Sequence, residues 1–98
     1  MISGEYILKT IRSNKDELGK FGIHRIGLFG SYIRNEQSRD SDIDILIEFY
    51  PDQESFDNFM AICDYIENLF RNKKIEVITR NSLSSYIGPS ILNEVVYA

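Results

Sequence analysis

The middle of the chain, from Ile23 to Phe49, constrains the fold more than any other part. It opens with the apolar run Ile23–Phe29, which Gly30-Ser31 closes, and it ends with the alternating run Asp42–Phe49. Both runs are typical of β-strands, because successive side chains of a strand point to opposite faces. Between them, Tyr32–Glu36 predicts a short helix with Ser31 at its N-cap. A strand, a helix and a second strand in this order favour a small α/β domain.

Helices and one more strand are predicted on either side of this unit. Apolar residues recur at helical spacing from Ser3 to Phe21, with Ser3 as N-cap and Gly22 as the stop. After a turn at residues 50–52, the longest helix is predicted over Ser55–Arg71, followed by a strand over Lys74–Thr79. A closing helix is predicted around Ile91–Val96, after Pro89. All 98 residues are expected to form a single domain, residues 1–98, because a chain of this length supports one core.

Charge and cysteine content exclude several classes of protein. The formal net charge is −4, and no block of basic residues exists that could displace counterions from a nucleic acid, so direct nucleic-acid binding is not expected. Cys63 is the only cysteine, which rules out an internal disulfide and a cysteine metal cluster. No run approaches the length of a membrane span, and no signal peptide is recognisable. We therefore expect a soluble, cytoplasmic protein without membrane contact.

Gly30-Ser31 is a candidate phosphate cradle. A glycine at a strand end lets the backbone approach a phosphate closely, and the following helix offers free N–H groups. The Ser31 hydroxyl adds a donor, and Arg34, one turn later, could reach phosphate oxygens. Taken alone, Gly-Ser is more commonly a tight turn with a serine cap, and Arg34 could equally pair with Glu36, Asp40 or solvent.

Asp42 and Asp44 predict a metal site. Residues at i and i+2 of a strand project from the same face, so the two carboxylates lie close and repel each other. Mg²⁺ is bound by oxygen ligands, often one or two carboxylates together with substrate phosphates. A solvent-facing strand would explain Asp42 but explains Asp44 less well, since apolar residues surround it.

Glu76 is the third candidate carboxylate. It interrupts the apolar strand Lys74–Thr79, with Ile75 and Val77 on the opposite face. If this strand lies beside Asp42–Phe49, Glu76 can reach the same metal and accept a proton from an attacking hydroxyl. A solvent-facing strand residue is an equally good interpretation of its spacing.

Together these residues resemble a known family. Gly30-Ser31, ten intervening residues and Asp42-Ile43-Asp44 resemble the GS-x10-D-x-D signature of the minimal nucleotidyltransferases (MNT), a compact branch of the polymerase-β-like superfamily. The resemblance extends over nearly the whole chain. It implies an α/β domain with a short mixed sheet packed against helices.

Chains of this size in the family resemble the antitoxins of HEPN–MNT toxin–antitoxin modules. The resemblance implies transfer of AMP from ATP, with Mg²⁺, to a tyrosine of a HEPN ribonuclease toxin in a hetero-oligomer. It implies that Gly30 and Ser31 hold the triphosphate, that Asp42 and Asp44 ligate metal, and that Glu76 takes the third carboxylate position. The family usually has aspartate there, and glutamate is one methylene longer.

Two other functions are compatible with these residues. The substitution at position 76 favours an antitoxin that neutralises its toxin by binding without catalysis. Larger relatives suggest transfer to a small acceptor such as an aminoglycoside, although a chain of 98 residues leaves little room for a second, acceptor-binding domain.

Overall fold

A four-stranded mixed sheet organises the protein, which is described here from a computed structural model covering residues 2–98. The strand order is β3-β2-β1-β4. β1 pairs antiparallel with both β2 and β4, whereas β2 and β3 are parallel. The strands are β1 (Ile23–Phe29), β2 (Ile43–Phe49), β3 (Ile75–Thr79) and β4 (Val96–Tyr97).

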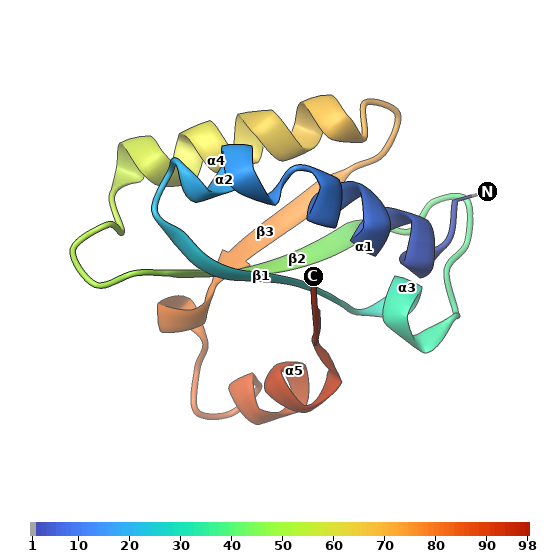
Figure 1. The fold of residues 1–98 in the computed structure, drawn as a ribbon. Coiled ribbons are helices and arrows are strands. Elements are labelled where there is room, and N and C mark those ends of the chain that lie inside the picture. Colours follow the sequence, from blue (N-terminus) through green and yellow to red (C-terminus); the bar gives the residue numbers. More distant parts are fainter. Residues whose placement is uncertain (1) are drawn as a thin grey trace.

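The helices cover the two faces of this sheet unequally. Figure 1 shows α1, α2 and α4 together on one face and α5 alone on the other, with α3 at one end of the sheet. The helices are α1 (Gly4–Ser13), α2 (Lys15–Gly19), α3 (Ser31–Arg34), α4 (Phe56–Leu69) and α5 (Gly88–Glu94), and a 3₁₀ turn, η1 (Arg80–Ser82), follows β3. None of the helices within residues 2–98 combines the length and apolar character needed to cross a membrane.

The hydrophobic core lies between the sheet and α1, α2 and α4. Isoleucine dominates it, which suits a packed sheet because β-branched side chains fit the pleated surface. Fully buried members are Ile7 and Ile11 of α1, Leu18 of α2, Ile26 and Leu28 of β1, Ile43, Ile45 and Ile47 of β2, and Ile62 and Ile66 of α4. Within residues 2–98 no polar or charged side chain is counted as buried.

Several elements confirm the sequence prediction closely. β1 has the predicted bounds, and β2, α4 and β3 begin one residue later than predicted. Ser3 and Ser55 are N-caps whose hydroxyl oxygens accept hydrogen bonds from the backbone N–H groups of Tyr6 and Asn58. A serine immediately before an amphipathic run is therefore a reliable start signal in this chain.

The first predicted helix is divided in two, so the prediction of one helix from residue 3 to residue 21 was wrong. Asn14 separates α1 from α2, with its side-chain amide donating to the Thr10 carbonyl and its Oδ1 accepting from the Tyr65 hydroxyl. An asparagine side chain that bonds locally competes with continued helix. α2 then ends at Gly19, before the predicted stop at Gly22, and a tight hydrogen-bonded turn leads into β1.

Two further predictions need correction. Ser31 is the first residue of α3, Gly30 occupies the N-cap position, and no side chain caps this helix. The closing helix ends at Glu94, and Val96–Tyr97 forms a fourth strand, β4, against β1. Consecutive valines followed by tyrosine favour extended backbone, which explains the change from helix to strand.

Candidate functional site

Two neighbouring strands, β2 and β3, bring the predicted carboxylates to one end of the sheet. In the β-ladder Asp44 lies opposite Phe29, the last residue of β1, and next to Glu76 of β3. Asp42 immediately precedes β2. The adjacency of β2 and β3 that the prediction for Glu76 required is therefore present. Asp44 and Glu76 are partners in the parallel register, whereas Asp42 lies two residues along the chain from Asp44.

Gly30 lies directly against Asp44. Its backbone has a φ of 83°, a conformation that L side chains rarely adopt, and a Cβ atom at this position would overlap Oδ2 of Asp44. Only glycine therefore satisfies both the turn and the close approach of the carboxylate. Ser31 is partly exposed at the start of α3, beside this contact.

Arg34 belongs to the same cluster and has two carboxylate partners. Its Nε donates to Glu36 at 2.8 Å, and its Nη1 donates to Glu94 at 2.6 Å. The hydrogen bond with Glu36, and next the one with Glu94, raises the pKa of the guanidinium. The pairing with Glu36 was one of the alternatives left open by the sequence. The pairing with Glu94 was not anticipated.

Glu94 belongs to this cluster, and the sequence analysis did not single it out. From the end of α5 its Oε2 accepts a hydrogen bond of 2.9 Å from the backbone N–H of Gly30, while Oε1 pairs with Arg34. Partial burial acts to raise the pKa of Glu94, but the hydrogen bonds from Arg34 and Gly30 outweigh it and lower the pKa. Glu94 is 64 residues from Gly30 in the chain. No local pattern could have linked the two.

The electrostatic environment of Asp44 is unfavourable for a charged carboxylate. Burial, followed by the neighbouring charges of Glu76 and Asp42, raises the pKa of Asp44 from an ordinary value of 3.8 to about 6. Arg34 opposes this shift only partly. A cation beside Asp44 would relieve the repulsion, because opposite charge favours the ionised form of a carboxyl group.

A cavity of about 600 Å³ opens beside these groups. Three of the six predicted site residues, Gly30, Arg34 and Asp44, line it, and Ser31, Asp42 and Glu76 do not. The wall on the other side comes from α5 and the residues before it: Tyr86, Ile87, Ser90, Ile91 and Glu94. Tyr86 is 91% exposed at this wall. The cavity is large enough for a nucleotide, since small-ligand sites begin at about 300 Å³.

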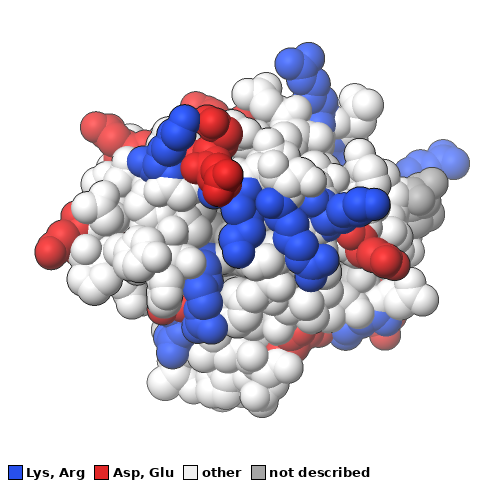
Figure 2. Space-filling view, viewed as in Figure 1, with Lys and Arg blue, Asp and Glu red and all other residues white. Residues whose placement is uncertain are grey.

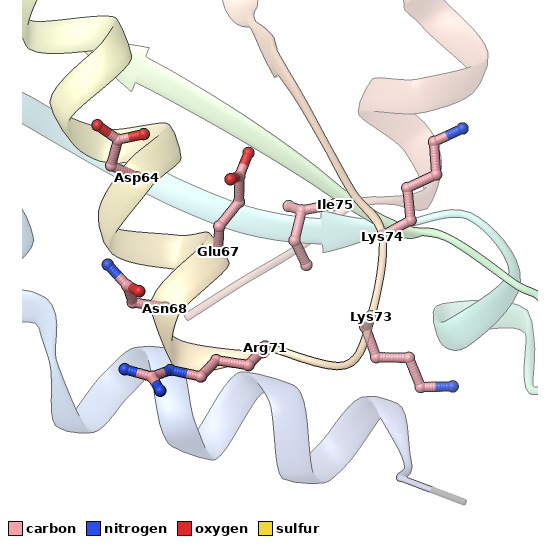
Figure 3. Close-up of a pocket in the computed structure, with 7 residues that line it drawn as sticks. All are labelled: Asp64, Glu67, Asn68, Arg71, Lys73, Lys74 and Ile75. Carbon is pink, nitrogen blue, oxygen red and sulfur yellow. The ribbon is translucent and has the colours of Figure 1, made fainter.

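A second hollow, of about 860 Å³, lies between α4 and the start of β3. Figure 3 shows that its charged side chains spread in different directions and do not converge on one point. Both signs of charge are present, with Asp64 and Glu67 on α4 and Lys73 and Lys74 on the following loop. It holds none of the predicted site residues.

The carboxylates of this cluster fit a metal ion that is bound partly by the protein and partly by phosphate oxygens of a bound small molecule. Within residues 2–98, no three His, Cys, Asp or Glu side chains converge closely enough to form a ready-made metal site. Mg²⁺ does not need one, because it is commonly bound by one or two carboxylates together with phosphate oxygens and water. Asp44 and its register partner Glu76 supply such oxygen donors.

Comparison with known protein sequences gives consistent relatives. The nucleotidyltransferase domain family matches residues 8–98. The protein adenylyltransferase MntA of Thermococcus cleftensis is 38% identical over 98 residues, which cover 99% of this chain and 97% of the relative. The compared region thus spans nearly the whole chain.

Solved structures show the same fold. A candidate minimal nucleotidyltransferase matches with a TM-score of 0.81 at 20% identity, covering 97% of this chain and 95% of the other. The structure of a tri-AMPylated Shewanella oneidensis HEPN toxin in complex with an MNT antitoxin contains a chain that matches with a TM-score of 0.57 at 18% identity, covering 96% of this chain and 66% of that one. These matches confirm the small α/β fold with a mixed sheet that the signature implied.

Proposed function

Since the chain belongs to the nucleotidyltransferase domain family and is a nucleotidyltransferase, we propose that it transfers AMP from ATP to a tyrosine hydroxyl of a HEPN ribonuclease and acts as its antitoxin. The observation that carries this proposal is the contact between Asp44 and Gly30 beside Arg34, at the mouth of a nucleotide-sized cavity. The acceptor is inferred from the relatives, among them a protein adenylyltransferase and an MNT antitoxin bound to an AMPylated HEPN toxin.

In this proposal the triphosphate binds at the end of β1. The N–H of Gly30, the hydroxyl of Ser31 and the guanidinium of Arg34 are donors that can hold phosphate oxygens. Asp42, Asp44 and Glu76 are the proposed ligands of Mg²⁺, which would neutralise phosphate charge and the departing pyrophosphate. The raised pKa of Asp44 supports this assignment, because burial and then the charges of Glu76 and Asp42 disfavour its ionised form, and a bound cation would favour that form.

The chemical step is an in-line displacement. The tyrosine oxygen attacks the α-phosphorus of ATP, a new P–O bond forms, and the bond to the bridging oxygen of the β-phosphate breaks, releasing pyrophosphate. Glu76 accepts the hydroxyl proton as general base. Glu76 is exposed, so a hydroxyl on another protein could reach it. Positioning and charge neutralisation supply most of the rate in such transfers.

The test is the intact mass of a HEPN toxin co-expressed with this protein. Wild type should add the mass of one or more AMP groups, and Asp44→Ala should add none while still folding. Asp40→Ala is the matched control, because it removes an exposed aspartate from the loop before β2 and should leave the modification unchanged.

Other outcomes identify the other functions. An unmodified toxin that is still bound and neutralised by wild type would show an antitoxin that acts by binding alone. Consumption of ATP with a small acceptor and no protein partner would show a small-molecule nucleotidyltransferase. Full modification by Asp44→Ala would contradict the proposed site.

A further inference from the structure

Glu94 accepts hydrogen bonds from the two donors that a nucleotide phosphate would need. Its two oxygens accept hydrogen bonds from the Gly30 N–H at 2.9 Å and from the Arg34 guanidinium at 2.6 Å. We propose that Glu94 is an internal competitor of the triphosphate, so that binding of nucleotide requires this carboxylate to leave Gly30 and Arg34. The inference rests on the proposed function, since it assumes that phosphates bind at these two residues.

The competition follows from shared chemistry. A carboxylate and a phosphate both accept charge-assisted hydrogen bonds from arginine and from backbone N–H groups. The Gly30 N–H has only one hydrogen to donate, and Glu94 already accepts it. Only 21% of the Glu94 side chain is exposed, whereas about half of its partner Arg34 is exposed. Glu94 and a phosphate oxygen therefore cannot both occupy the position.

Charge adds to the competition. The Asp44 carboxylate lies against Gly30 at the position of its missing Cβ, while the Glu94 carboxylate lies at the N–H of the same residue. A triphosphate placed there would meet both carboxylates and would add a third group of negative charge. Like charges at short range repel strongly where solvent is partly excluded. A cation bound at Asp44 would offset the charge of Asp44 but would leave Glu94 to be displaced.

The structure allows Glu94 to move. It is the last residue of α5, and Val95 after it is already extended. α5 lies alone on its face of the sheet (Figure 1), and Gly88 is its only buried residue. Beyond Val95, the chain is attached through the two residues of β4 and through Ala98, whose backbone N–H donates to the Ile26 carbonyl. Displacement of Glu94 therefore disturbs few buried contacts.

The experiment compares nucleotide affinity in wild type and Glu94→Gln by isothermal titration calorimetry. The probes are MgATP, magnesium pyrophosphate and adenosine. Glutamine keeps the shape of the side chain and removes its charge, so MgATP and magnesium pyrophosphate should bind about tenfold more tightly, a change that corresponds to the loss of one modest charged hydrogen bond. Adenosine, which carries no phosphate, should bind equally to both proteins.

Glu36→Gln is the matched control. It removes the other carboxylate that pairs with Arg34 but makes no bond to Gly30. Its effect on MgATP affinity should be clearly smaller than that of Glu94→Gln. An equal effect would show that only the charge near Arg34 matters, and would overturn the assignment of Glu94 to the phosphate position.

The remaining outcomes separate this inference from the proposed function. The inference is overturned if wild type binds MgATP and both Glu94→Gln and Glu94→Ala bind it no more tightly than wild type. That result would leave the proposed function standing. Absence of MgATP binding by every variant would overturn both. Circular dichroism of each variant establishes that it is folded before affinities are compared.

Discussion

At the scale of single residues, Asp44 is the most informative side chain in this protein. It is half-buried, lies against Gly30, and has Glu76 as its neighbour on the next strand. Folding places this carboxylate where its charged form is disfavoured, which costs stability. A ligand or cation that completes the site would offset this penalty, which makes Asp44 a candidate for a functional role.

We predict that Asp44→Asn stabilises the free protein above about pH 6. The folded state raises the pKa of Asp44 from 3.8 to about 6, so between these values it binds more protons than the unfolded state. Wild-type stability therefore falls as the pH rises through this window, and asparagine avoids the loss. The gain should be roughly 1 kcal/mol, well below the full value of the shift because solvent screens a half-exposed group.

Urea denaturation of both proteins at about pH 4 and about pH 8 checks this. The difference in unfolding free energy between Asp44→Asn and wild type should be small at about pH 4 and should reach its full value at about pH 8. Asp40→Asn, at an exposed position, serves as control and should show no such dependence. A destabilised Asp44→Asn at about pH 8 would contradict the electrostatic account.

At the scale of elements, β4 depends on a glycine in the middle of β1. A Cβ on Gly27 would lie 2.6 Å from Val95 Cγ2 and 3.0 Å from the Val96 carbonyl oxygen. Gly27→Ala should therefore push β4 from the sheet and loosen the C-terminal end of α5, at a cost of about 1–3 kcal/mol. Hydrogen exchange should then speed up at the amide of Ala98, which donates to the Ile26 carbonyl.

Gly19→Ala is the matched control for this substitution. Nothing lies within 4 Å of a Cβ at Gly19, which is the last residue of α2. Alanine there should be neutral or slightly stabilising, because it favours helix and restricts the unfolded chain. If the Ala98 amide exchanges hydrogen at the same rate in Gly27→Ala as in wild type, then the close approach of β1 and β4 is not needed to hold the C-terminus.

The elements that sequence predicts well are those with a strong internal pattern. The apolar run of β1 and the serine-capped stripe of α4 carry their own signals, since period and cap coincide. At the break, the Asn14 side chain bonds both to Thr10 and to Tyr65, 51 residues away, and β4 is only two residues long. Neither could be read from local spacing.

The same distinction applies to the candidate site. Gly30, Asp42 and Asp44 lie within one strand–helix–strand unit, so their spacing carries information about their geometry. Glu76 could be proposed only on the condition that β3 lies beside β2, which the register shows. Glu94 occupies a helix that returns from the far end of the chain, and its role depends entirely on tertiary contact.

At the scale of the whole molecule, charge and layers are arranged asymmetrically. Figure 2 shows lysine and arginine side chains gathered over α1, where Lys9 and Arg12 are exposed. That helix lies on the face of the sheet opposite to α5 (Figure 1). Among the described residues that line the candidate cavity, Arg34 is the cation and Glu94 already pairs with it. The cavity therefore has little free positive charge to offer a triphosphate.

From this asymmetry we predict that nucleotide stabilises the protein only together with a divalent metal. A ligand that binds only the folded state, at a free concentration of a hundred times its Kd, raises the free energy of unfolding by about 2.7 kcal/mol. In a domain of this size that raises Tm by roughly 10 °C or more. MgATP should produce such a shift in a thermal scan. ATP with EDTA should produce little, because its charge would meet Asp44 and Glu94 without a compensating cation. Mg²⁺ alone should have a small effect, since it would lack the phosphate ligands that complete its coordination. An equal shift with ATP in EDTA would show that protein groups alone neutralise the triphosphate, and the carboxylates would then need another role.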